Sequence, residues 1–197
     1  MGAFFQSLGR TIAAGVVVLI VLLILLAAAG GRVSLGDHGW WSFAMRWLHV
    51  TAGVMWIGLL WYFNFVQTPS MPKIPDEQKP AISKVIAPTA LFWFRWAAMA
   101  TIILGLLLAL MNNYLVQALT LQKPFTSIGL GAWLGTIMWF NVWFVIWPNQ
   151  KKVLGIVQVS ADEKAAAAKR AGMTSRINTM LSIPMLYCMA AQSHGGF

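Results

Sequence analysis

The chain has 197 residues, of which 59% are hydrophobic and only 10% are charged, and its formal net charge is +9. Soluble domains carry about a quarter charged residues, so this composition excludes an ordinary soluble protein and indicates an integral membrane protein. The single cysteine, Cys188, excludes a disulfide framework, a CxxC pair and the CxxCH motif that attaches c-type haem. The three histidines show no ligand spacing, which also excludes a structural zinc site.

Five apolar stretches follow one another along the chain. Crossing a bilayer core of about 30 Å takes about 20 helical residues, and such stretches lie near residues 11–29, 43–66, 89–111, 127–147 and 174–194. The last is the weakest because Asn178, Ser182 and Pro184 interrupt it, and four helices are the alternative. We predict an all-α integral membrane protein, a single transmembrane domain over residues 1–197 with about five helices.

The first stretch has features of a signal peptide, since Arg10 precedes it and three alanines end it. Its apolar core, residues 11–29, exceeds the roughly 7–15 residues of a signal h-region. We therefore predict a transmembrane helix.

Two connections have a distinctive composition. Residues 69–88 contain five prolines and are predicted to form an ordered but non-helical crossing. Residues 160–172 combine helix-forming alanines with Asp162 and Glu163 near their start, where the helix dipole favours acidic side chains. We predict a short cytoplasmic helix there that leads into the last span.

Lysine and arginine are distributed unequally between the two sides. Three lie on one side (Arg32, Arg46 and Lys123), and ten lie on the other: Arg10, Lys73, Lys79, Lys84, Lys151, Lys152, Lys164, Lys169, Arg170 and Arg176. The positive-inside rule then predicts a cytoplasmic N-terminus and a periplasmic C-terminus in a bacterial inner membrane. No basic run alternates with exposed aromatics, so we expect contacts with the lipid bilayer and none with nucleic acid.

His49 lies within the second predicted span, where an ionisable side chain indicates a functional site. Gly53 and Trp56 follow on the same helix face and would let a flat group approach the backbone. His194, at the outer end of the last span, lies on the same side of the membrane. These residues predict a b-type haem, with iron bound by His49 and with His194 as the first choice for the second axial ligand.

Two further residues belong to this haem hypothesis. Arg46, one turn above His49, is placed to pair with a haem propionate. The two histidines differ in predicted depth by about 9 Å at 1.5 Å per residue, and Met189, deeper on the last helix, is the alternative ligand. The competing interpretations are that His49 hydrogen-bonds a neighbouring helix while His194 and His38 are solvated, or that His49 has a proton or metal role.

A second group of polar residues lies toward the cytoplasmic side. Arg95 and Asn141 lie within spans, and Asn64, Gln67 and Asn178 lie nearer the edge. Since no acidic residue occurs in any span, amide oxygens and backbone carbonyls are the candidate partners of Arg95. Arg95, Asn64 and Asn141 form a weakly preferred set for binding an anionic substrate or a quinone carbonyl. Interhelical hydrogen bonding is the alternative that we favour for these residues.

Several ordered sequence blocks resemble a known family. The blocks are residues 46–58 (RWLHVTAGVMWIG), 62–67 (YFNFVQ), 93–96 (WFRW), 146–152 (IWPNQKK), 175–179 (SRINT), 182–185 (SIPM) and 193–194 (SH). Over roughly residues 40–194 they are similar to the membrane-embedded N-terminal domain of bacterial urate hydroxylase-type urate oxidases.

The resemblance implies a membrane domain that, in the full-length enzymes, is joined to a C-terminal cytochrome c domain. That pair oxidises urate and passes electrons to the respiratory chain. Because the sequence ends at Phe197 without a CxxCH motif, we expect a short form whose cytochrome c partner is a separate polypeptide. The resemblance also strengthens the expectation of haem b at His49.

We therefore predict a membrane-bound b-type haem protein that transfers electrons to an external cytochrome c-like partner. If it is an enzyme, it is an oxidoreductase that oxidises urate, although no catalytic residue can be assigned. The alternative is a cofactor-free accessory subunit of a larger respiratory or other membrane redox complex, in which aromatic and glycine-rich faces contact protein. A small transporter is disfavoured because paired broken helices and intramembrane acids are absent from the sequence.

Overall fold

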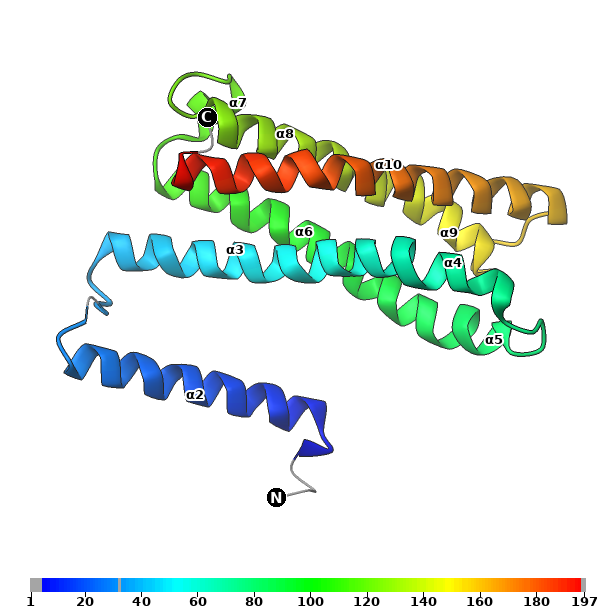
Figure 1. The fold of residues 1–197 in the computed structure, drawn as a ribbon, viewed down its shortest axis with the longest axis horizontal. Coiled ribbons are helices and arrows are strands. Elements are labelled where there is room, and N and C mark those ends of the chain that lie inside the picture. Colours follow the sequence, from blue (N-terminus) through cyan, green and yellow to red (C-terminus); the bar gives the residue numbers. More distant parts are fainter. Residues whose placement is uncertain (1–4, 32, 196–197) are drawn as a thin grey trace. The chain divides into compact units, whose positions relative to one another are not determined.

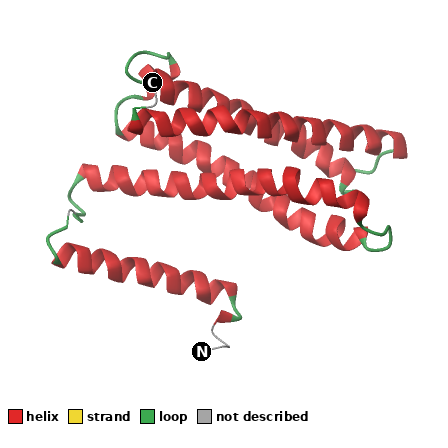
Figure 2. Ribbon diagram, in the orientation of Figure 1, coloured by secondary structure: helices red, strands yellow, loops and turns green. Residues whose placement is uncertain are grey.

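The structure, a computed structural model, describes residues 5–31 and 33–195, and every regular element within these ranges is helical (Figure 2). The all-α class predicted from the sequence is thereby confirmed. The chain divides into two compact units, Met1–Ala44 and Met45–Phe197.

The first unit contains α2 (Leu8–Ala28), a helix of 21 residues in which no side chain is buried. It coincides with the predicted first span to within three residues. The unit also contains the first residues of α3 (His38–Trp61). Asp37 caps that helix by accepting hydrogen bonds from the backbone nitrogens of Gly39 and Trp40 at 3.1 and 3.2 Å.

The second unit is an antiparallel bundle of four long helical segments (Figure 1). The first consists of α3 (His38–Trp61), η1 (Tyr62–Gln67), α4 (Thr68–Ser70) and η2 (Met71–Lys73). The second consists of α5 (Lys79–Ala81), η3 (Ile82–Ile86) and α6 (Ala87–Met111). The third consists of α8 (Thr126–Phe140), η4 (Asn141–Ile146) and α9 (Trp147–Val153), and the fourth is α10 (Ala161–His194). A short helix, α7 (Leu115–Leu119), lies between the second and third segments.

Among the described residues, four helices are long and apolar enough to cross a membrane: Leu8–Ala28, His38–Lys73, Lys79–Met111 and Thr126–Val153. The fifth predicted span does not stand alone, because residues 160–172 and 174–194 form one continuous helix, α10. Ser160 begins α10, and its hydroxyl oxygen accepts a hydrogen bond from the Glu163 backbone nitrogen at 3.2 Å.

The proline-rich connection was predicted to be non-helical, and this prediction is wrong for most of its length. Residues 68–73 and 79–88 are helical, which leaves only residues 74–78 as the connection. Pro69, Pro72, Pro80 and Pro88 each lie in the first two positions of a helical segment. Only Pro80 lies at the start of a continuous helix, Lys79–Met111, where the missing proline N–H has no intrahelical partner to lose. Pro69, Pro72 and Pro88 lie within the continuous helices His38–Lys73 and Lys79–Met111.

Three wide π-helical segments each end two positions before a proline. Segment η1 ends before Pro69, η3 before Pro88 and η4 before Pro148. Proline cannot donate the usual helical hydrogen bond, and its ring crowds the carbonyl four residues earlier, which lies inside the π segment in all three cases. We attribute the widened turns to this clash. Pro184 lies inside α10 without such a segment, so a proline alone does not suffice.

The core of the second unit contains side chains from all four segments. Its completely or almost completely buried members include Trp56 and Leu60 of α3, Phe94 of α6, and Met138 of α8. Many large apolar side chains on the outer faces remain exposed, among them Val54, Trp93, Ile103 and Phe144.

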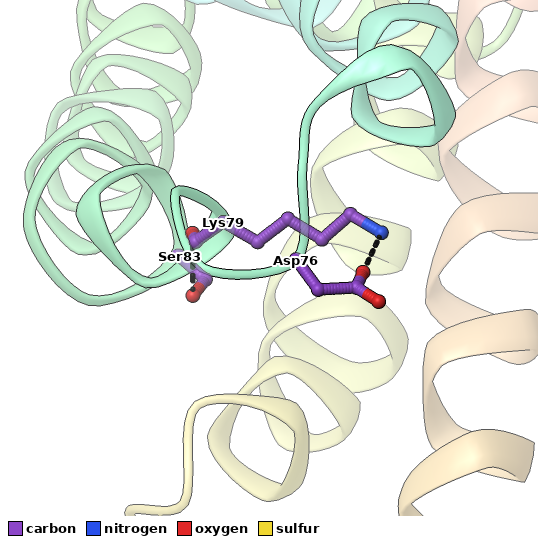
Figure 3. A network of polar contacts seen from close by, with 3 residues as sticks. All are labelled: Asp76, Lys79 and Ser83. Atoms are coloured by element: carbon purple, nitrogen blue, oxygen red, sulfur yellow. Dashed lines mark hydrogen bonds and ion pairs between the residues drawn. The ribbon is translucent and has the colours of Figure 1, made fainter.

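The connections 74–78 and 154–160 lie at one end of this bundle, and α7 lies at the other (Figure 1). We call the first the basic end because Lys73, Lys79, Lys151 and Lys152 lie there. In the tight 74–78 connection, Lys79 forms an ion pair with Asp76, and its backbone carbonyl accepts a hydrogen bond from the Ser83 hydroxyl at 3.1 Å (Figure 3). The hydrogen bond from Lys79, together with its positive charge, lowers the pKa of Asp76.

Candidate functional site

His49 lies where α3 crosses α6. Its Nδ1 is 2.9 Å from the backbone oxygen of Thr101. Gly105 lies one helical turn further along α6, and a Cβ placed there would be only 2.8 Å from His49 Cε1. A Cβ on Gly53 of α3 would meet the Thr101 methyl group at 3.8 Å. The two glycines therefore allow the helices to approach, and Gly105 in particular provides the space for the imidazole ring.

The contact with Thr101 assigns the tautomer of His49. A carbonyl oxygen only accepts hydrogen bonds, so Nδ1 carries the hydrogen and Nε2 keeps the free lone pair in the neutral ring. Histidines that bind metals through one nitrogen commonly donate from the other to a backbone carbonyl, which fixes the orientation of the ring. His49 has this arrangement, with Nε2 as the nitrogen available to an iron or to a hydrogen-bond donor.

His194 and His49 contact different parts of the structure, and no described residue links them. His194 is exposed at the end of α10, and its Nδ1 lies 3.0 Å from the Ala190 backbone oxygen of its own helix. Met189 packs against α8, where a Cβ on Gly131 would lie 3.3 Å from the Met189 methyl group. One axial ligand of the predicted haem is thus oriented, and neither candidate for the second contacts it.

Arg46 of α3 is exposed. Its charge is close enough to affect Tyr114, which lies in the connection between α6 and α7. Burial raises the pKa of the Tyr114 hydroxyl, and the positive charge of Arg46 lowers it to a lesser extent. The Tyr114 ring stacks on Phe125 with ring centroids 5.1 Å apart. Arg46 therefore lies on the α7 side of His49, one turn from it on the same helix.

The three residues predicted to bind an anionic substrate have different partners. The Arg95 guanidinium carbon lies 3.4 Å from the centre of the Trp147 ring, a cation–π contact. Asn141 Nδ2 donates to Asn178 Oδ1 at 2.8 Å, and Asn178 Nδ2 donates to the Met138 carbonyl at 2.9 Å. Asn141 and Asn178 thus link α10 to the α8–η4 segment, as the hydrogen-bonding alternative proposed.

Asn64 has a different environment, since it lines a cavity of about 120 Å³ near the basic end. The wall of this basic-end cavity contains residues of η1, α4, α6, η4, α9 and α10. They are Phe63, Asn64, Gln67, Thr68, Ala87, Leu91, Phe94, Ile146, Gln150, Ala171, Gly172, Ser175 and Arg176. Two of the three π segments contribute residues directly, and the third leads into Ala87, so the proline-associated widening surrounds this cavity. Widened π turns of this kind are frequent at functional sites.

The polar part of the cavity wall is only partly hydrogen-bonded. Asn64 Nδ2 donates to the Leu60 carbonyl at 2.9 Å and to Ser175 Oγ at 2.8 Å. Both amide hydrogens of Asn64 are therefore used, and its Oδ1 is the atom left for a further partner. Gln67 Oε1 is buried and has no hydrogen-bond partner among the described residues. Arg176 is exposed and also lines the cavity.

Within the described ranges, no group of three or more His, Cys, Asp or Glu residues could hold a metal ion. A haem needs axial ligands rather than such a group, so the haem hypothesis depends on His49 and its unidentified partner.

Sequence reasoning missed several residues around both sites. Thr101 acts through its backbone oxygen, which no residue type reveals. Gly105 was visible only as one of many small residues. Ser175 and Arg176 lie in blocks that resemble the known family, but their place beside Asn64 depends on the antiparallel packing of α10 against η1.

These observations define a helical protein with several helices of membrane-spanning length and apolarity. The family model described as urate oxidase N-terminal matches residues 122–196. The match includes α8, η4, α9 and α10, and hence Asn141, Met189 and His194, but not His49 or Arg95. It supports the resemblance to this family over that part of the chain. Comparison with curated proteins and with solved structures gave no significant match.

Proposed function

We propose that the chain is a multi-pass protein of a bacterial inner membrane, with its N-terminus in the cytoplasm and its C-terminus in the periplasm. Support comes from the four apolar helices of sufficient length and from the exposed apolar side chains on the outer faces of the bundle. The clustering of lysines at one end of the second unit agrees with the positive-inside rule.

The second half of α10 is the fifth span in this proposal. It runs antiparallel to α8: Gln192 Oε1 accepts from the Ile128 backbone nitrogen at 3.2 Å, and Asn178 bonds with Asn141 thirteen residues further along. Because α10 accompanies α8 over this whole length, it crosses the membrane wherever α8 does. Two of its polar residues are completely buried: Asn178 faces α8 and η4, and Ser182 Oγ accepts a hydrogen bond from Trp61 Nε1 of α3 at 3.0 Å.

We further propose membership of the urate oxidase N-terminal family and a function in electron transfer, with a haem b bound through His49 Nε2. The observation that carries this proposal is the contact between His49 Nδ1 and the Thr101 carbonyl, which presents Nε2 in the tautomer that an axial ligand requires. His194 is the proposed second ligand, since its Nδ1 contact with Ala190 leaves its Nε2 available in the same way. A bound haem would supply one-electron redox chemistry.

The electron acceptor in this proposal is an external cytochrome c-like partner, and urate is the proposed substrate if the protein is an enzyme. The family match supports urate as the first substrate to examine. Arg46, exposed and one turn from His49, is the residue placed to pair with a haem propionate.

The test is the reduced-minus-oxidised visible spectrum of the detergent-purified protein, compared with those of His49→Ala and His38→Ala. The proposal predicts a b-type α-band in the wild type and in His38→Ala, and its loss in His49→Ala. A folded wild-type protein with a flat spectrum would refute it. Reduction of the band by added urate would separately test the substrate.

The second candidate function is a cofactor-free accessory subunit of a larger membrane redox complex. The broad exposed aromatic surface of α6, with Phe92, Trp93 and Trp96, favours this candidate because such a surface suits a protein neighbour as well as lipid. Stoichiometric co-purification with larger subunits, unaffected by His49→Ala, would support it over the haem protein.

A further inference from the structure

The basic-end cavity combines an apolar wall with neutral polar groups. Phe63, Leu91, Phe94 and Ile146 form apolar wall, and the Phe63 and Phe94 rings meet edge to face with centroids 5.8 Å apart. No acidic residue lines the cavity, and its one charged residue is the exposed Arg176. The buried polar groups of the wall are neutral amides and a hydroxyl, which favours a ligand whose buried part is also neutral, because a buried anion requires a buried charge partner.

Two amide oxygens near this cavity are available to a ligand. Gln67 Oε1 is buried without a partner among the described residues, which costs free energy unless a donor reaches it. Asn64 Oδ1 is held in place by the two hydrogen bonds of its Nδ2. A ligand that completes this wall therefore carries an O–H or N–H donor. The Ser175 hydroxyl and the Arg176 guanidinium supply donors for an oxygen of the same ligand.

The volume limits the ligand to a single ring. A protein cavity of about 150 Å³ holds one benzene molecule, and the basic-end cavity measures about 120 Å³. The space therefore encloses at most one unsubstituted ring, and the substituents of a larger ligand lie outside it.

We propose that the basic-end cavity binds the head ring of a membrane quinol. The ring lies against Phe63 and Phe94, one quinol hydroxyl donates to Gln67 Oε1, and the Arg176 guanidinium donates to a quinol oxygen. This inference rests on the proposed membrane placement, since quinols dissolve in the bilayer, but it does not depend on haem at His49. It concerns binding alone.

Filling the cavity provides the first test. A Cβ on Gly172 would meet no atom within 4 Å, so Gly172→Leu places its side chain in open space and also removes a helix-destabilising glycine. Gly58→Leu is the matched control, because Gly58 is exposed, lies outside the cavity, and likewise has no atom within 4 Å of an added Cβ. Binding of a short-tailed ubiquinol to the full chain in nanodiscs is measured by calorimetry under anaerobic conditions.

We expect Gly172→Leu to abolish quinol binding while its melting temperature stays at or above that of the wild type. Gly58→Leu should bind as the wild type does. Wild-type affinity in Gly172→Leu, or no binding of the quinol to the wild type, would overturn the proposal.

Replacing the orphan acceptor provides the second test. Gln67→Leu should weaken quinol binding about tenfold, the usual effect of one hydrogen bond. Gln122→Leu, which changes an exposed glutamine outside the cavity, should have no effect. The oxidised quinone, which lacks the donating hydroxyl, should bind the wild type about tenfold more weakly than the quinol. Equal binding of quinol to the wild type and Gln67→Leu would contradict the assignment.

Urate distinguishes the membrane-soluble ligand from a water-soluble one. We expect urate not to displace the bound quinol, and displacement by urate at lower concentration than by quinone would overturn the quinol assignment. Because these readouts are affinities, a flat haem spectrum together with quinol binding would refute the proposed electron-transfer function and leave this inference standing.

Discussion

The α3–α6 crossing and the basic-end cavity are two polar sites in the same helical bundle, and they are built in opposite ways. At the crossing, glycine and threonine bring the helices together, and His49 Nδ1 has a partner at 2.9 Å. At the cavity, residues of the π turns η1 and η4 form part of the wall, and Gln67 Oε1 has no partner among the described residues.

The difference separates a polar group that the chain itself satisfies from one for which the structure shows no partner among the described residues. An unpaired buried polar atom is costly in an apolar bundle, and we propose above that a quinol hydroxyl supplies the donor for Gln67 Oε1. His49 shows both situations in one ring: Nδ1 contacts the Thr101 carbonyl, and Nε2 has no hydrogen-bond partner among the described residues.

The largest expected loss of unfolding free energy comes from adding a side chain at Gly105, where α3 and α6 cross. In Gly105→Val the new Cβ would lie 2.8 Å from His49 Cε1 and 3.0 Å from Nδ1, so the ring must move and lose its contact with Thr101. We expect a loss of about 1–3 kcal/mol in unfolding free energy, measured by denaturant titration in detergent. Gly58→Val is the control, since no atom lies within 4 Å of its added Cβ. Equal stability of the two variants would show that the crossing is not tight.

A smaller loss is expected where the chain satisfies its own amides. Asn178→Leu removes the acceptor of Asn141 Nδ2 inside the bundle and should cost about 1–2 kcal/mol. The double variant with Asn141→Leu should cost less than the sum of the two single variants, because no unpaired amide then remains. Additive losses in this double-mutant cycle would contradict the pairing.

Substitutions at Arg95 and Trp147 test whether an aromatic ring, rather than an acidic side chain, stabilises the arginine inside this bundle. Its contact with the Trp147 ring is a cation–π interaction worth about 0.5–2 kcal/mol, so Trp147→Leu should lower the unfolding free energy by that amount beyond the loss of apolar contact. In an Arg95→Gln background the same substitution should cost correspondingly less. An identical cost in both backgrounds would remove the cation–π account.

The smallest effect concerns the exposed connection at the basic end. The hydrogen bond and the charge of Lys79 lower the pKa of Asp76 from 3.8. The pair therefore stabilises the fold above that pH, and its contribution disappears as the pH falls through the lowered value. Asp76→Asn should slightly lower the melting temperature at pH 7 and not in more acidic solution. Glu77→Gln, the neighbouring acid, serves as the control. A difference that persisted in acid would exclude the ion pair as its cause.

The helical fold was largely predictable, because helix length and apolar composition determine where segments of membrane-spanning length begin and end. The errors concern prolines. Pro69, Pro80 and Pro88 suggested a non-helical connection, whereas each lies in the first positions of a helical segment. Composition indicates that a proline interrupts hydrogen bonding but does not say whether the chain ends the helix or widens one turn.

The candidate sites were predictable only in part. The depth of His49 identified it as a notable residue, yet its partner is a backbone oxygen 52 residues away in sequence. Asn64 was identified as a polar residue near the cytoplasmic edge of its span, whereas Ser175 became relevant only once α10 was seen beside η1. Arg95 was expected near amide oxygens, and an aromatic ring occupies that place instead. Long-range packing decides these contacts, and a single sequence does not encode it visibly.

Ligand exchange at His49 tests the central claim most directly. If His49 Nε2 is an axial ligand, His49→Met should retain a haem while shifting its α-band and raising its midpoint potential, since methionine ligation raises the potential of a haem. The measurement is a spectroelectrochemical titration of the purified wild type and His49→Met. An α-band and potential that are identical in the two proteins, or no haem band in the folded wild type, would contradict the account.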